Sequence, residues 1–215
     1  MQKVTLTFDN GPEPEVTPRV LDILAKRGLQ TTFFVVGQKL LDPARMNLAT
    51  RAREEGHRIG NHTFTHSTPL GQMEDTAAAV AELEKTDALV AKTGETDKLF
   101  RPFGGGGKLG PHLLNPQVVD FLHRNAYSCV LWNAIPRDWA DPDGWVDRAL
   151  EQIASQDHTL LVLHDLPTGA MDHLEDFLDR ADAIGVEFRS DFPPDCVPML
   201  DGRDMVPLAP YVSTL

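Results

Sequence analysis

Short apolar runs alternate with helical patterns along most of this 215-residue chain, and this alternation limits its possible folds more than any other feature. Residues 4–8, 31–36 and 159–163 are rich in apolar, β-branched and aromatic side chains, as expected of strands. One intervening helical segment opens with Thr17-Pro18, where Thr17 suits the N-cap, and closes at Gly28. Strands that alternate with helices favour right-handed βαβ units and a parallel sheet in an α/β fold. An open doubly wound sheet and a barrel both fit this pattern.

The pattern divides the chain into seven expected strands and six expected helices. The strands cover residues 4–8, 31–36, 57–60, 98–101, 127–132, 159–163 and 186–188. The helices cover residues 18–27, 43–55, 73–93, 116–125, 143–154 and 170–184. We find no internal repeat and no linker, so we expect one domain over residues 1–215, with an irregular, proline-rich tail from about residue 191.

The composition argues against two classes of partner. The chain has 32 Asp and Glu against 20 Lys and Arg, a formal net charge of −12. Such a chain repels phosphate at long range, so we expect it to bind neither nucleic acid nor a membrane. No apolar stretch is long enough to span a bilayer, and no signal peptide precedes the first expected strand. We therefore expect a cytoplasmic protein, although a trimmed leader would leave the same picture; the oligomeric state stays open.

Polar residues gather just after the expected strands. In a parallel α/β fold the carboxyl ends of the strands share one face, where loops build the active site. Five strand ends carry titratable or metal-binding groups, which indicates a shared site rather than chance. The residues concerned are Asp9, Asn10, His62, His66, Arg101, Asp138 and His164.

His62 and His66 are spaced to bind one ion. Residues four apart on a helical turn lie on the same face, and imidazole suits Zn²⁺ and related ions. The alternative is a pair of histidines in a surface turn.

Two further residues could act as an acid and a base. His164 ends a very apolar strand, where a histidine can exchange protons near neutral pH or can simply be a satisfied core residue. Asp9 at the tip of the first strand could likewise be a base or a cap. The glycine run before Lys108 is a poor phosphate-binding loop, because no Ser or Thr follows the lysine and the segment Leu109-Gly110-Pro111 would not open a helix.

Taken together and in order, these residues resemble the motifs of the polysaccharide deacetylase family (NodB homology, carbohydrate esterase family 4). The matching segments are Thr7-Phe8-Asp9-Asn10-Gly11-Pro12, His62-Thr63-Phe64-Thr65-His66, Arg101-Pro102-Phe103-Gly104-Gly105, Asp138-Trp139 and Leu161-Val162-Leu163-His164-Asp165. The resemblance covers most of the chain and implies a single-domain distorted (β/α)₇ barrel.

The resemblance also implies roles for these residues in amide hydrolysis. Asp9 would be the catalytic base, and Arg101 would keep it ionised. His164 would protonate the leaving amine, and Asp138 would keep that histidine charged and aligned. A backbone N–H near Gly104 would help to stabilise the oxyanion.

The implied metal site departs from the family pattern. His62, His66 and Asn10 would hold a divalent ion, with Zn²⁺ expected first and Co²⁺ or Ni²⁺ as alternatives. Asn10 stands where the family has a metal-binding aspartate, and an amide oxygen brings no charge. We therefore expect weak metal binding. Phe103 replaces a proline of the third motif and alters the wall of the groove.

Three functions remain open from the sequence. The first is deacetylation of an N-acetylated sugar or sugar conjugate. The second is hydrolysis of small linear or cyclic amides, as in allantoinase-like enzymes. The third is carbohydrate binding without catalysis, which the retention of both an acid and a base disfavours.

Overall fold

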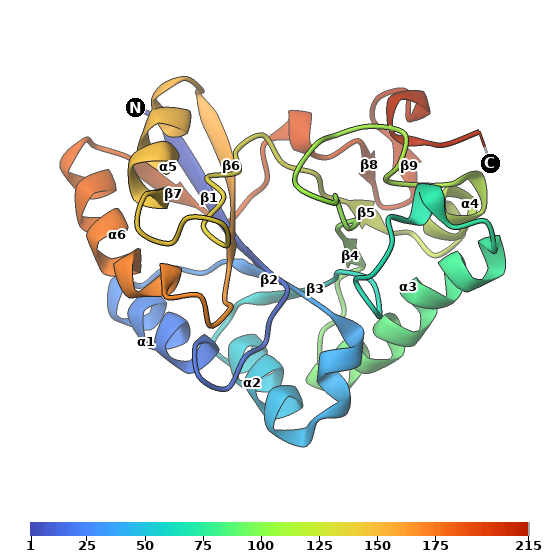
Figure 1. The fold of residues 1–215 in the computed structure, drawn as a ribbon, viewed down its shortest axis with the longest axis horizontal. Coiled ribbons are helices and arrows are strands. Elements are labelled where there is room, and N and C mark those ends of the chain that lie inside the picture. The colour runs from blue at the N-terminus through green and yellow to red at the C-terminus, as the bar shows by residue number, and fades with distance from the viewer. Residues whose placement is uncertain (215) are drawn as a thin grey trace.

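The computed structural model describes residues 1–214, whose nine strands form one curled sheet with the helices on its outside (Figure 1). The strands are β1 (Lys3–Asp9), β2 (Thr32–Val35), β3 (Arg58–Asn61), β4 (Leu99–Phe100), β5 (Ser128–Cys129), β6 (His158–His164), β7 (Glu187–Arg189), β8 (Met199–Leu200) and β9 (Arg203–Asp204). The helices are α1 (Thr17–Arg27), α2 (Pro43–Glu54), α3 (Thr76–Val90), α4 (Pro116–Arg124), α5 (Trp145–Ala154) and α6 (Leu174–Ala183).

The strand order confirms the expected distorted barrel. The sheet runs β6-β1-β2-β3-β4-β5-β8-β9, and neighbours from β6 to β5 are parallel. Strand β7 pairs with the first residues of β1. The segment after β5 returns to β6 through a single parallel bridge between Ala134 and Leu161. This one bridge completes the ring, so the barrel is uneven and its strands are short at β4 and β5.

The alternation of side chains along β1 separates the outer layer from the inside of the barrel. Val4, Leu6 and Phe8 belong to the apolar cluster that includes the buried faces of α1 and α6. Because successive side chains of a strand point to opposite faces, Thr7 and Asp9 point inward. Asp9 is the last residue of β1, so its carboxylate lies at the mouth of the barrel.

The first turns of α1 and α2 differ in whether a side chain caps the helix. Asp42 is the N-cap of α2 and accepts a hydrogen bond from Ala44 N–H. Thr17 is not the cap of α1, because Val16 occupies that position without a side-chain hydrogen bond. The Thr17 hydroxyl instead donates to the carboxylate of Asp165 and accepts from Glu13 N–H. The prediction was wrong because a buried tertiary partner takes the hydroxyl.

The tail from residue 191, which we expected to be irregular, contains one short hairpin. Strands β8 and β9 form a hairpin, and β8 pairs antiparallel with β5 through Met199 and Cys129. The turn is Asp201-Gly202, with φ of 48° and 70°. Positive φ at both central residues is typical of a tight hairpin turn. Buried Met199 gives this hairpin an apolar anchor.

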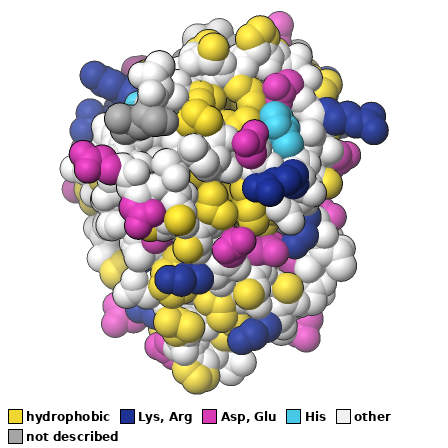
Figure 2. Space-filling view, turned by 90° about the vertical axis from the view of Figure 1, so that its right-hand side faces the viewer, with side chains coloured by type: hydrophobic (Ala, Val, Ile, Leu, Met, Phe, Trp, Pro, Cys, Tyr) yellow, Lys and Arg dark blue, Asp and Glu magenta, His cyan; other side chains and the backbone are white. Residues whose placement is uncertain are grey.

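On the side that carries α3, α4 and the tail, basic and acidic side chains are interspersed among apolar ones (Figure 2). Within residues 1–214 no helix is both long and apolar enough to cross a membrane.

Candidate active site

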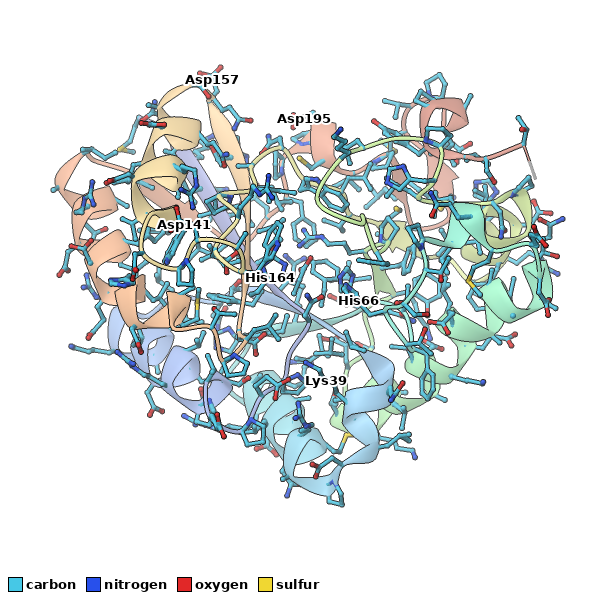
Figure 3. All side chains as sticks on the ribbon, in the orientation of Figure 1. Lys39, His66, Asp141, Asp157, His164 and Asp195 are labelled. Atoms are coloured by element: carbon cyan, nitrogen blue, oxygen red, sulfur yellow. The ribbon has the colours of Figure 1, made fainter. Side chains whose placement is uncertain are left out.

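A cavity of about 220 Å³ opens at the carboxyl ends of the strands. Its walls combine the polar residues expected from the sequence with aromatic side chains and a glycine loop. The lining includes Asp9, Asn10, His62, His66, Phe103, Gly104, Gly105, Gly106, Gly107, Trp132, Trp139 and His164. Figure 3 shows His66 and His164 near the centre of the molecule, inside the arc of helices. Arg101 and Asp138 are fully buried and contact the lining through Asp9 and His164.

Asp9 is held by a guanidinium inside the barrel. Arg101, which is fully buried, donates from Nη1 to Asp9 Oδ1 at 2.7 Å and to Thr7 Oγ1 at 2.7 Å. It also donates to the carbonyls of Val130 and Leu131, each at 3.2 Å. Burial raises the pKa of Asp9, but the charge of Arg101, reinforced by that of His164, outweighs burial and holds that pKa below its usual value. Asp9 is therefore ionised at neutral pH.

Asp9 faces His164 across neighbouring strands. The pairing of β1 with β6 sets Asp9 directly beside His164 in register. His164 Nδ1 is 2.8 Å from Asp138 Oδ1, and its backbone N–H donates to Asp138 Oδ2 at 2.8 Å. Burial lowers the pKa of His164, but the hydrogen bond and charge of Asp138 outweigh it and raise the pKa above its usual value. A proton donor and an ionised carboxylate thus meet at one cavity.

His62 and His66 come together as predicted, although not on a helical turn. Their ring centroids are 4.9 Å apart. They lie in the loop after β3, where Thr63 and His66 have positive φ values of 65° and 52°. The helical-turn reasoning was wrong because Asn61, through its side-chain oxygen, accepts from Thr63 N–H at 3.0 Å and turns the chain before a helix can start.

The orientation of His62 leaves one ring nitrogen free for a ligand. Its Nδ1 lies 2.8 Å from the carbonyl oxygen of Arg101, and a carbonyl can only accept, so Nδ1 carries the proton. Nε2 then presents its lone pair near Asp9, whose Oδ2 is 3.7 Å away. Burial lowers the pKa of His62 and lowers that of His66 to about 3, so both rings are neutral, as metal ligands must be.

Asn10 carries a polar group at the cavity that could serve as a third metal ligand. Its Oδ1 is buried in the wall of the cavity and has no hydrogen-bond partner among residues 1–214. Within the same residues no group of three His, Cys, Asp or Glu side chains could hold a metal ion. The unpaired amide oxygen of Asn10 and the two imidazoles of His62 and His66 are donors that could hold a divalent ion such as Zn²⁺.

The aromatic wall was only partly visible in the sequence. Phe103 packs on His66 with ring centroids 3.9 Å apart, and Trp139 lies edge-on to His164 at 4.7 Å. Trp132 donates from its indole N–H to Gly107 O at 2.9 Å. A Cβ at Gly104 would approach the Trp132 ring to 2.7 Å, so the glycine run lets its loop lie flat on this indole. Trp132 ends an expected apolar strand and carried no other signal of a role.

Replacing Asp138 by asparagine should move the alkaline limb of the pH–activity profile to lower pH. Asp138 is what raises the pKa of His164, and the acid form is lost as pH rises through that pKa. With the carboxylate gone, the loss begins at lower pH, and activity near neutrality falls about tenfold or more. The measurement is kcat/KM against pH for both proteins. Asp141→Asn, an exposed carboxylate in the same loop, is the control, and an unmoved alkaline limb in Asp138→Asn would refute the assignment.

Comparison with known proteins decides the family. The sequence model described as polysaccharide deacetylase matches residues 1–126. The chain belongs to the polysaccharide deacetylase family. Over 166 residues it is 31% identical to a chitooligosaccharide deacetylase of Sinorhizobium fredii, covering 75% of this chain and 71% of that protein. It is also 31% identical over 166 residues to a peptidoglycan-N-acetylglucosamine deacetylase of Bacillus cereus, covering 75% of this chain and 72% of that one.

Solved structures of the polysaccharide deacetylase family share the fold. The peptidoglycan deacetylase PdaC from Bacillus subtilis superimposes with a TM-score of 0.72 at 27% identity, covering 87% of this chain and 86% of that one. A family 4 acetyl xylan esterase from Clostridium thermocellum, in complex with a cobalt ion, gives a TM-score of 0.70 at 27% identity, with 88% of each chain covered.

Proposed function

We propose that the chain is a metal-assisted hydrolase that removes the acetyl group from N-acetylated amino sugars. The observation that carries this proposal is the pairing of Asp9 with His164 across β1 and β6 at the same cavity, where the pKa of the carboxylate is lowered and that of the imidazole is raised. The named relatives support the substrate class, since both are deacetylases of N-acetylated saccharides. The aromatic wall of Phe103, Trp132 and Trp139 suits the apolar face of a sugar ring.

The residues of the chain divide the reaction into two proton transfers. Asp9 accepts a proton from water as the water oxygen attacks the acetyl carbonyl carbon. His164 gives a proton to the amide nitrogen as the carbon–nitrogen bond breaks, so the products are acetate and a free amino sugar. Arg101 keeps Asp9 ionised for the first transfer, and Asp138 keeps His164 protonated for the second.

A divalent ion held by His62, His66 and Asn10 would polarise the acetyl carbonyl and acidify water. We propose Zn²⁺ as that ion, with Co²⁺ or Ni²⁺ as substitutes. The test is acetate release from N-acetylated chitooligosaccharides by chelator-treated protein before and after each metal is added. Release that depends on added metal supports the proposal, whereas ammonia from a small amide without acetate from the sugar would favour the other hydrolase class.

Asn10→Asp should bind Zn²⁺ at least about tenfold more tightly than the wild type. Two neutral imidazoles and a neutral amide leave the dipositive charge uncompensated, and a carboxylate adds direct Coulomb attraction. The measurement is titration of metal-free protein with Zn²⁺ against a chromophoric chelator. Asn47→Asp adds the same charge at an exposed position on α2 and should leave the affinity unchanged. A wild-type protein that holds one tight ion, with no gain in Asn10→Asp, would contradict the expectation.

A further inference from the structure

Glu82 on α3 is bonded to the backbone of the loop that carries His62 and His66. Its Oε2 accepts from Phe64 N–H at 2.9 Å and from Thr65 N–H at 2.7 Å. The Thr65 hydroxyl lies 3.1 Å from both carboxylate oxygens. One carboxylate thus binds two consecutive backbone N–H groups immediately before His66, and such charge-assisted bonds are stronger than neutral ones.

The loop needs such a partner because its backbone is strained. Thr63 and His66 both have positive φ, a region that is unfavourable for residues with a Cβ and most of all for a β-branched residue such as Thr63. Gly37 and Gln38 donate to the carbonyls of Thr63 and Phe64, each at 2.9 Å, and so hold the acceptor groups of the turn. Glu82 holds its donor groups at Phe64 and Thr65. Together these bonds fix the backbone from both sides.

The two histidines depend on Glu82 to different degrees. His62 has its own supports, a bond from its backbone N–H to Val35 O at 3.0 Å and the bond from Nδ1 to Arg101 O. The His66 ring has packing contacts with His62 and Phe103. The backbone just before His66 is held by the carboxylate of Glu82, so loss of that carboxylate would release His66 first.

We infer that Glu82 is a positioning residue that sets metal affinity by holding His66 within reach of the ion. This inference rests on the proposed function, because it assumes that His66 binds a metal. Under this inference, the residues that determine metal binding include one on α3, eighteen positions beyond Phe64. Glu82 touches neither the cavity nor a substrate, so its effect passes entirely through the loop.

The test compares Zn²⁺ affinity among variants on α3. Glu82→Ala removes both acceptors and should weaken Zn²⁺ binding roughly 10- to 100-fold, the usual effect of losing a group that orients a metal ligand. Glu82→Gln keeps one oxygen that can accept from both N–H groups, so it should restore most of the affinity. Glu84→Ala, an exposed glutamate on the same helix, is the matched control and should bind as the wild type does. If Glu82→Ala does not fold, Glu82→Asp serves in its place.

A second readout separates positioning from general stability. Zn²⁺ raises the Tm of a protein that binds it in the folded state. We expect Glu82→Ala to show a smaller Zn²⁺-induced rise in Tm than the wild type. An equal rise, with only a lower Tm in both the metal-free and the metal-bound protein, would overturn the inference while leaving the proposed function intact. A wild-type chain that binds no Zn²⁺ would overturn both.

Discussion

Asp9→Asn is expected to lower kcat for acetate release by about 10²- to 10⁴-fold, the usual contribution of a positioned general base. The substitution keeps the shape of the side chain and its place at the end of β1. It removes the charge that accepts the proton from water. Because Arg101 lowers the pKa of Asp9 against the effect of burial, the wild-type carboxylate is ionised near neutral pH, and asparagine cannot take its place.

Two controls tie this loss to the base. Asp143→Asn changes a carboxylate whose side chain is 94% exposed and should leave kcat unchanged. Zn²⁺ affinity of Asp9→Asn, measured alongside, shows whether the neighbouring Asn10 still presents its oxygen. Wild-type kcat in Asp9→Asn would rule out Asp9 as the base.

Arg101→Leu is expected to destabilise the fold by about 3–5 kcal/mol, which is typical of removing one partner of a buried ion pair. The guanidinium is fully buried and bonds to Asp9, Thr7 and two backbone carbonyls. Its loss leaves the Asp9 carboxylate buried without a counter-charge. The measurement is the free energy of unfolding from urea titration at neutral pH.

The double variant tests the cause of that loss. Asp9→Asn in the Arg101→Leu background removes the uncompensated charge, so part of the stability should return. If the double variant is less stable than Arg101→Leu alone, the buried charge is not the source of the destabilisation.

The sequence predicted strands that alternate with helices, and the polar residues expected after those strands either line one cavity or bond to its lining. This succeeded because parallel strands end on one face, so residues such as Asp9 and His164 meet wherever their strands are neighbours. The family resemblance then favoured a barrel over an open doubly wound sheet, whereas the periodicity of the apolar residues fitted both. The part of the sheet that closes the barrel consists of very short segments: β4, β5 and the single bridge at Ala134. Segments this short do not show a periodicity that distinguishes a barrel from an open sheet.

Long-range partners account for what the sequence did not predict. Thr17 has the identity of a helix cap, but buried Asp165 takes its hydroxyl. In the sequence Glu82 is an ordinary glutamate of an expected helix. Its role depends on its hydrogen bonds to the backbone of Phe64 and Thr65, which only the packing of that loop against α3 creates. The hairpin in the tail has a local signal in the sequence, because Asp201-Gly202 is a favoured tight turn.

Acetate release from an N-acetylated chitooligosaccharide at saturating Zn²⁺ tests the central claim most directly. The account predicts one free amino sugar for each acetate, activity that chelation abolishes and added Zn²⁺ restores, and loss of about 10²-fold or more in Asp9→Asn. Two results would contradict the account. In one, wild-type protein that is shown to bind Zn²⁺ releases no acetate. In the other, the Asp9→Asn variant releases acetate as fast as the wild type.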